Sequence, residues 1–108
     1  MNETTVLSKL SFVMRGDELQ RIHVDEVDSK LEITIDLHQF KCKDAKRILQ
    51  NIINVNRCSF TLHVIHGYNH GTAIKAMIYE QLNTQRIIQK SSPTWNPGET
   101  YIEILESI

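Results

Sequence analysis

The fold is decided around one alternating segment, LEITIDLH, which spans residues 31–38. Leucine and isoleucine occupy every second position, which is the period of a β-strand with one buried face. Asp36 and His38 fall on the opposite, polar face near the end of the segment. The pattern therefore predicts a half-buried strand that presents a carboxylate and an imidazole at its carboxyl end.

The hydrophobic period changes to helical spacing between Cys42 and Val55. Apolar side chains then form one stripe, and basic or amide side chains form the other face. The stripe holds Ala45, Ile48, Leu49, Ile52 and Ile53, and the polar face holds Lys43, Lys46, Arg47, Gln50 and Asn54. We expect an amphipathic helix with a basic outer face, which either binds phosphates or is an ordinary solvated surface.

Further along the chain, residues 60–66 form a short apolar, β-rich run that predicts a buried strand. A glycine-bearing turn at 67–71 leads into a helix that Thr72 can cap and that reaches about Asn83. Two more strands are expected at 86–90 and 100–105, on either side of a loop with two prolines. The inward face of the second helix is expected to hold Ala73, Ile74, Met77, Ile78 and Leu82.

This order of elements predicts an α/β (α+β) two-layer sandwich, in which two helices cover a small mixed sheet. We assign the sandwich to residues 31–108. Residues 1–30 are treated as an N-terminal extension, in which 6–13 and 21–27 are either extra strands or an arm. A chain of 108 residues with 41% hydrophobic and 23% charged residues is typical of one globular domain.

The expected location is cytoplasmic. No run approaches the roughly 20 apolar residues of a membrane span, and the N-terminus does not have the pattern of a secretory signal. The two cysteines, Cys42 and Cys58, match no metal-binding spacing, so we expect reduced thiols.

Charge is unevenly distributed although the net charge is only −1. Residues 1–36 hold eight acids and four bases, a balance of −4, whereas residues 37–90 hold eight bases and two acids, a balance of +6. The last eighteen residues add three glutamates. A local positive field attracts polyanions even when the whole chain is nearly neutral, so nucleic acid is not excluded as a partner.

The segment HGYNHGT, residues 66–72, joins the second predicted strand to a helix. Such a turn leaves backbone N–H groups free at the positive end of the helix dipole, and its glycines let an anion approach closely. The spacing matches neither a P-loop nor a dinucleotide-binding motif. Alone, the segment indicates a phosphate site without specifying the ligand.

Taken together, the two motifs resemble those of Smr (small MutS-related) domains. IDLHQ at residues 35–39 is similar to the LDLHG signature, and IHGYNHG at residues 65–71 is similar to the HGxGxG turn. The resemblance covers about residues 31–106 and suggests a stand-alone bacterial-type member. It implies a fold like the C-terminal domain of the third translation initiation factor. Several Smr domains nick DNA or cleave RNA, commonly with a divalent cation.

The resemblance implies a catalytic centre made of Asp36, His38 and His66. A histidine would act as acid or base, while Asp36 would orient it or hold a hydrated Mg²⁺ or Mn²⁺. Gln39 and Asn69 replace usual glycines, and asparagine tolerates the backbone conformation better than glutamine does. The resemblance thus supports binding better than catalysis. The implied phosphate-binding residues are Gly67, Tyr68, Asn69, His70, Gly71, Thr72, Lys75, Lys43 and Arg47.

Other interpretations of these residues are weaker. A zinc site of His63, His66 and His70 would need a strand and a turn to converge without any cysteine. Cys42 has no evident partners for nucleophilic catalysis. Trp95 either stacks on a base or covers the edge of the core, and Tyr68 is also placed for stacking.

Three functions follow. The first is a nucleic-acid-binding Smr protein that acts as a structure-selective nicking endonuclease on branched DNA or structured RNA. The second is a non-catalytic adaptor that binds RNA, the ribosome or a protein partner through the same basic surface. The third is a domain that binds small anions or proteins through the helix N-terminus alone. The sequence does not distinguish DNA from RNA, because it contains no base-reading module.

Overall fold

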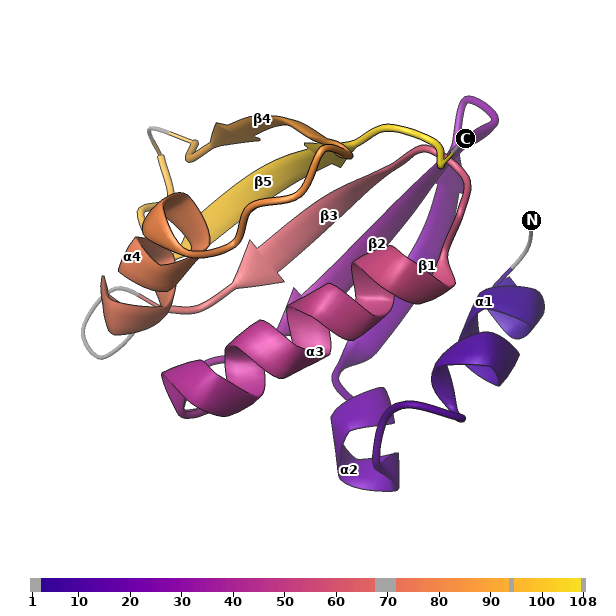
Figure 1. The fold of residues 1–108 in the computed structure, drawn as a ribbon, viewed down its shortest axis with the longest axis horizontal. Helices are drawn as coiled ribbons and strands as arrows, with labels where there is room; N and C mark the ends of the chain where they lie inside the picture. Colours follow the sequence, from indigo (N-terminus) through magenta and orange to yellow (C-terminus); the bar gives the residue numbers. More distant parts are fainter. Residues whose placement is uncertain (1–2, 68–71, 94, 108) are drawn as a thin grey trace.

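The computed structural model describes residues 3–67, 72–93 and 95–107, which form an α+β fold with a five-stranded mixed sheet (Figure 1). The order of strands and helices predicted from residue 31 onward is confirmed. The elements are α1 (Glu3–Leu10), α2 (Gly16–Leu19), β1 (Ile22–Val27), β2 (Lys30–Asp36), α3 (Cys42–Val55), β3 (Phe60–Ile65), α4 (Thr72–Glu80), β4 (Ile87–Ser91) and β5 (Glu99–Ile104).

The strand order across the sheet is β1-β2-β3-β5-β4. Strands β2 and β3 are parallel, and the other neighbours are antiparallel. A parallel pair needs a crossover connection, which α3 supplies. The carboxyl ends of β2 and β3 therefore share one edge, where Asp36 is the register partner of Ile65.

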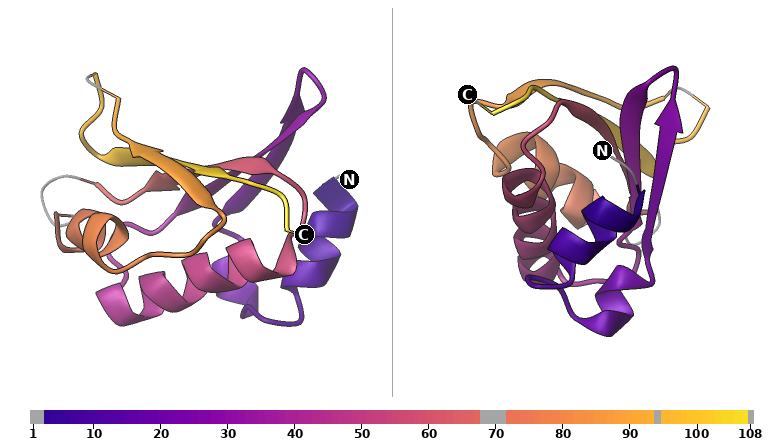
Figure 2. Two further views of the ribbon diagram at one scale, coloured as in Figure 1. Left: turned by 45° about the horizontal axis from the view of Figure 1, so that its top comes forward. Right: turned by 90° about the vertical axis from the view of Figure 1, so that its right-hand side faces the viewer.

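The helices lie on one side of the sheet, and the other side is open (Figure 2). Alternate residues of β2 are buried as predicted, and Leu37, which follows the strand, is also fully buried. The predicted apolar stripe of α3 packs in the same core: Ala45, Ile48, Leu49, Ile52 and Ile53 are all buried. The alternation of strands and the helical stripe together account for the two layers.

The prediction for residues 6–13 is wrong, because α1 covers most of this segment. Val6 and Leu10 are both fully buried and lie four residues apart, one turn of a helix. The candidate strand at 21–27 is confirmed as β1, which pairs with β2. The described N-terminal residues thus complete the same core, and four helices rather than two accompany the sheet.

Helix α4 ends at Glu80 rather than near Asn83. Its buried residues are Ile74, Met77 and Ile78, whereas Ala73, in the first turn of the helix, is exposed. Leu82 is buried after the helix has ended. Within the described parts of the chain, no helix is both long and apolar enough to cross a membrane.

Candidate functional site

A carboxylate–imidazole pair lies at the end of β2. Oδ1 of Asp36 accepts the backbone N–H of His38 at 3.1 Å and lies 2.5 Å from Nδ1 of the same histidine. A carboxylate only accepts hydrogen bonds, so Nδ1 is the donor, and in the corresponding neutral tautomer Nε2 keeps its lone pair. The His38 and Asp36 side chains are 48% and 37% exposed. The pair therefore presents an oriented and accessible imidazole.

The chain reverses directly after His38 through a left-handed residue. Gln39 has a φ of +71°, and Phe40 donates its N–H to the Leu37 carbonyl at 3.1 Å. This turn lets α3 begin at Cys42. Glycine adopts such a φ without strain, whereas another residue pays about 1–2 kcal/mol. Gln39 thus holds a conformation that glycine would adopt without this energetic cost.

The second motif lies against the first. Gly67 has a φ of +76°, and a Cβ added to it would lie 3.9 Å from Cβ of His38. The N–H groups of His66 and Gly67 both donate to the Gly98 carbonyl, at 2.9 and 3.0 Å. The structure therefore brings the strand-end pair and the start of the glycine turn together.

The phosphate-binding residues predicted in the turn are only partly described. Gly67 ends the first described range, and Thr72 is the first residue of α4. The predicted contacts of Tyr68, Asn69, His70 and Gly71 lie outside the described residues. The positive end of the α4 dipole nevertheless lies just beyond this turn, where an anion is stabilised.

His66 is buried rather than open to a substrate. Its side chain is 1% exposed, Nδ1 donates to the Gly67 carbonyl at 2.7 Å, and Nε2 accepts the Thr100 hydroxyl at 2.8 Å. Burial lowers the pKa of His66, and the positive charge of Lys75 lowers it further, against opposing effects of Gly67 and Glu99. With both ring nitrogens engaged, His66 joins the turn to β5 and does not share an open centre with His38.

Arg47 is occupied within the fold. Its guanidinium lies 2.6 Å from Oε2 of Glu18, a fully buried carboxylate that Arg15 also contacts at 3.2 Å. Burial alone would raise the pKa of Glu18, but the hydrogen bonds from Arg47 and Arg15 and both positive charges outweigh it and lower the pKa. The predicted phosphate contact of Arg47 is thus replaced largely by an internal ion pair.

Two other predicted basic residues remain available. Lys43 on α3 is exposed and Lys75 on α4 is half-buried. Among the described residues, neither lysine forms an ion pair. The positive charges of Lys43 and Lys75 are therefore not offset by an ion pair with a described residue.

Metal ligands are sparse in the described part of the chain, where no three His, Cys, Asp or Glu side chains are grouped to hold an ion. Oδ2 of Asp36 has no hydrogen-bond partner among the described residues. This single oxygen fits a Mg²⁺ or Mn²⁺ that keeps its waters and arrives with a phosphate, but it does not form a protein cage. His63 lies 2.9 Å from Glu32 on the open sheet face, so it does not join buried His66 in a zinc site.

The sequence analysis did not identify Gly98 and Thr100, which hold the glycine turn in place. Gly98 lies directly before β5, and Thr100 lies in it. A Cβ on Gly98 would lie 3.2 Å from Cα of Gly67, so only glycine allows this approach without a shift. The NPG sequence before the last strand signals a tight turn. It does not reveal the neighbour, because the antiparallel register of β3 and β5 creates that contact.

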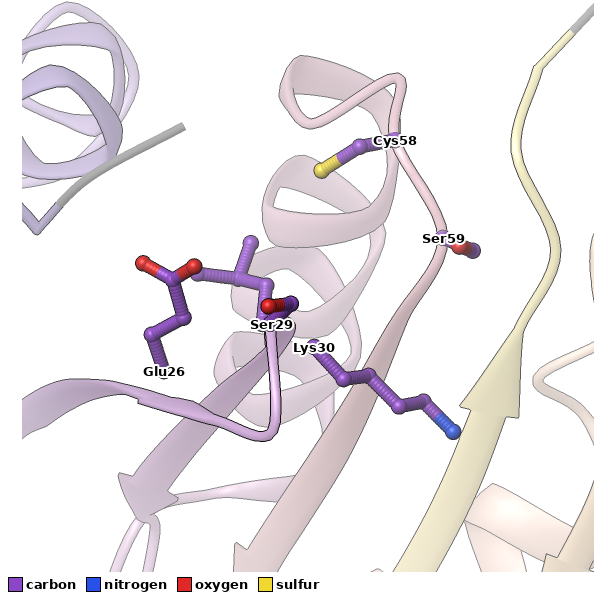
Figure 3. Close-up of a pocket in the computed structure, with 6 residues that line it drawn as sticks. Glu26, Ser29, Lys30, Cys58 and Ser59 are labelled. Carbon is purple, nitrogen blue, oxygen red and sulfur yellow. The ribbon is translucent and has the colours of Figure 1, made fainter.

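A surface pocket of about 250 Å³ lies at the opposite end of the sheet (Figure 3). The β1–β2 hairpin contributes Glu26, Ser29 and Lys30 to it, and the segment after α3 contributes Cys58 and Ser59. No histidine lines it, so Cys58 lacks the base that a thiol nucleophile requires. We therefore place the candidate site at the Asp36–His38 edge.

Comparisons with protein-family models, with curated proteins and with solved structures find no significant match for this sequence. The similarity to Smr domains accordingly rests on the two motifs and on the order of the elements between them.

Proposed function

We propose that this chain is a nucleic-acid-binding protein of the Smr type, which holds a phosphodiester of branched DNA or structured RNA at the shared edge of β2 and β3. One observation carries the proposal: the Asp36–His38 pair lies directly beside the Gly67 turn. An oriented imidazole next to an anion-binding helix N-terminus is suited to phosphoryl chemistry.

In this proposal His38 acts through Nε2. It removes the proton of an attacking water, whose oxygen bonds to phosphorus as the bond to the leaving oxygen breaks, and the leaving oxygen takes a proton from solvent. Asp36 holds Nδ1–H and stabilises the imidazolium that forms. The start of α4 and the lysines Lys43 and Lys75 offset the charge of the phosphoryl oxygens. Bound Mg²⁺ or Mn²⁺ would add positive charge there, with Asp36 as a carboxylate ligand. His66 takes no proton and positions the turn.

A second function, the non-catalytic adaptor, is favoured by the burial of His66. Cleavage requires one group to deprotonate the nucleophile and another to protonate the leaving oxygen. In the described residues, the site offers one accessible imidazole rather than two. The same edge would then bind RNA, the ribosome or a protein partner without cutting.

The test incubates the purified chain with supercoiled plasmid, a labelled four-way DNA junction and a structured RNA, each with Mg²⁺, Mn²⁺ or EDTA. Asp36→Asn and His38→Ala are the site variants. His23→Ala is a matched control, because His23 and Asp25 form another i, i+2 pair, 3.0 Å apart and well exposed, on β1. If the chain is a nuclease, we expect cleavage by the wild type and by the His23→Ala control, and no cleavage by either site variant.

Binding in a mobility-shift assay without cleavage would support the adaptor instead. Cleavage that persists in the site variants would overturn the assigned centre. If the wild-type chain neither cleaves nor binds any of the three substrates, the nucleic-acid-binding proposal fails, and the adaptor function is left with the ribosome or a protein as its partner.

A further inference from the structure

Trp95 is an exposed aromatic residue without an obvious structural role. It is the chain's single tryptophan, and 78% of its surface is accessible. Tryptophan is on average highly buried, and its exposed examples are enriched at binding interfaces. The alternative in which Trp95 covers the edge of the core does not agree with this exposure.

The loop that carries Trp95 is held by its own hydrogen bonds. Asn96 donates its N–H to the Pro93 carbonyl at 3.2 Å and accepts the Gly98 N–H on Oδ1 at 3.0 Å. Pro93 and Pro97 restrict the backbone on either side. Residues 95–98 of this loop are therefore held before a ligand stacks on Trp95, which reduces the entropy cost of binding.

The same loop is attached to the candidate site. The Gly98 carbonyl accepts both the His66 and Gly67 N–H groups. Figure 1 shows the β4–β5 connection at the same end of the molecule as the end of β3 and the start of α4. Gly98 follows Trp95 by three residues, which span at most about 11 Å even when the chain is fully extended. This length corresponds to about three nucleotide steps of a stacked strand.

We propose that Trp95 is a base-stacking subsite that receives an unpaired nucleobase a few nucleotides from the phosphate at the Asp36–His38 edge. This inference rests on the proposed nucleic-acid binding and narrows its substrate class. An unpaired base offers a free aromatic face, whereas bases inside a duplex are already stacked on each other. Trp95 would thus direct the chain to junctions, bulges and single-stranded flanks.

The test uses a fluorescein-labelled 12-nucleotide single-stranded RNA and a fully paired duplex of the same sequence. Anisotropy gives the affinities, and intrinsic fluorescence reports on Trp95 alone because no other tryptophan is present. We expect the single strand to quench Trp95. We expect Trp95→Ala to weaken single-strand binding by about 5- to 150-fold and duplex binding far less.

Two further variants control the experiment. Trp95→Phe keeps an aromatic face and should retain most of the single-strand affinity. Phe12→Ala removes a comparably exposed aromatic side chain, 86% accessible, and should change nothing. Phe12 follows α1, which lies at the other side of the molecule from the β4–β5 connection (Figure 1).

The outcomes separate the two proposals. Single-strand binding that is unquenched and unaffected by Trp95→Ala overturns the stacking subsite and leaves nucleic-acid binding standing. An equal loss for duplex and single strand also overturns the selectivity for unpaired bases. If the wild type binds neither RNA, the stacking subsite fails. The proposed function fails with it only if the wild type also binds neither the DNA junction nor the plasmid, and Trp95 is then a candidate protein contact.

Discussion

At the scale of single residues, Gln39 occupies a position that favours glycine. A φ of +71° destabilises the folded state by about 1–2 kcal/mol when the residue is not glycine. Glycine removes this strain, but its greater conformational entropy stabilises the unfolded chain by about 0.4–1 kcal/mol. We expect Gln39→Gly to raise the free energy of unfolding by roughly 0.5–1 kcal/mol in urea denaturation. Gln39→Ala keeps the strain and should show no gain. A destabilised glycine variant would contradict this account of the turn.

His66 makes stability depend on pH at the residue scale. Burial lowers its folded-state pKa, so the unfolded chain binds a proton more readily as pH falls below the ordinary histidine value of 6.5. This contribution to stability is present above pH 6.5 and is lost below it, with a slope of at most about 1.4 kcal/mol per pH unit.

Urea denaturation at pH 7.5, 6.5 and 5.5 measures this dependence. His66→Gln should be less stable at pH 7.5, because it disturbs the hydrogen bonds to Gly67 and Thr100, but it should lose less stability on acidification. Identical pH slopes for wild type and variant would show that His66 does not titrate on unfolding.

At the scale of elements, one side chain joins the end of α3 to the strands. The Arg86 guanidinium donates to the carbonyls of Ile53, Asn56, Cys58 and Leu105. It satisfies carbonyls at the end of the helix, where the backbone has no further partner. A lysine ammonium cannot reproduce this planar set of donors.

We therefore expect Arg86→Lys to lower the free energy of unfolding by about 2–4 kcal/mol. Arg57→Lys is the matched control, because Arg57 is exposed in the same region and should change stability by less than about 0.5 kcal/mol. Equal effects of the two variants, measured by thermal or urea unfolding, would refute the role assigned to Arg86.

Elements with a clear hydrophobic period could be predicted from the sequence, and those that depend on tertiary packing could not. β2 and α3 each bury one uninterrupted stripe, so their periods identify them. In contrast, α1 is short and is held by packing against α3 and β1, and the segment after it is held by the hydrogen bond from Asn51 to the Val13 carbonyl at 3.2 Å. Local spacing does not contain that information.

The same distinction between predictable and unpredictable features applies to the candidate site. The meeting of Asp36 and His38 with Gly67 could be predicted, because parallel strands place their carboxyl ends together. The burial of His66 depends on Thr100 of β5, and the occupation of Arg47 depends on Glu18 of α2. Both partners are distant in sequence, and no local pattern pairs them.

At the scale of the whole molecule, the fold separates acidic from basic surfaces. The sheet register places Asp25, Glu32 and Glu103 in one row across β1, β2, β3 and β5, on the side opposite the helices. Of the exposed lysines, Lys30 lies on this side and pairs with Glu103, whereas Lys41 and Lys43 lie before and on α3. A polyanion is therefore repelled from this acidic row and attracted to the lysines of the helices. This explains how a chain of net charge −1 could bind nucleic acid.

The separation predicts which lysines govern the salt dependence of binding. Each lysine that contacts a phosphate adds about 0.9 to the slope of log affinity against log salt concentration on duplex DNA. Lys43→Gln and Lys75→Gln should each lower the affinity and flatten this slope, measured by anisotropy between 50 and 200 mM salt. Lys30→Gln is the control, because Lys30 pairs with Glu103 at 3.0 Å on the acidic side. If Lys30→Gln weakens binding as much as the helix variants do, the polyanion must cross the sheet face, and the orientation argued from the charge separation is wrong.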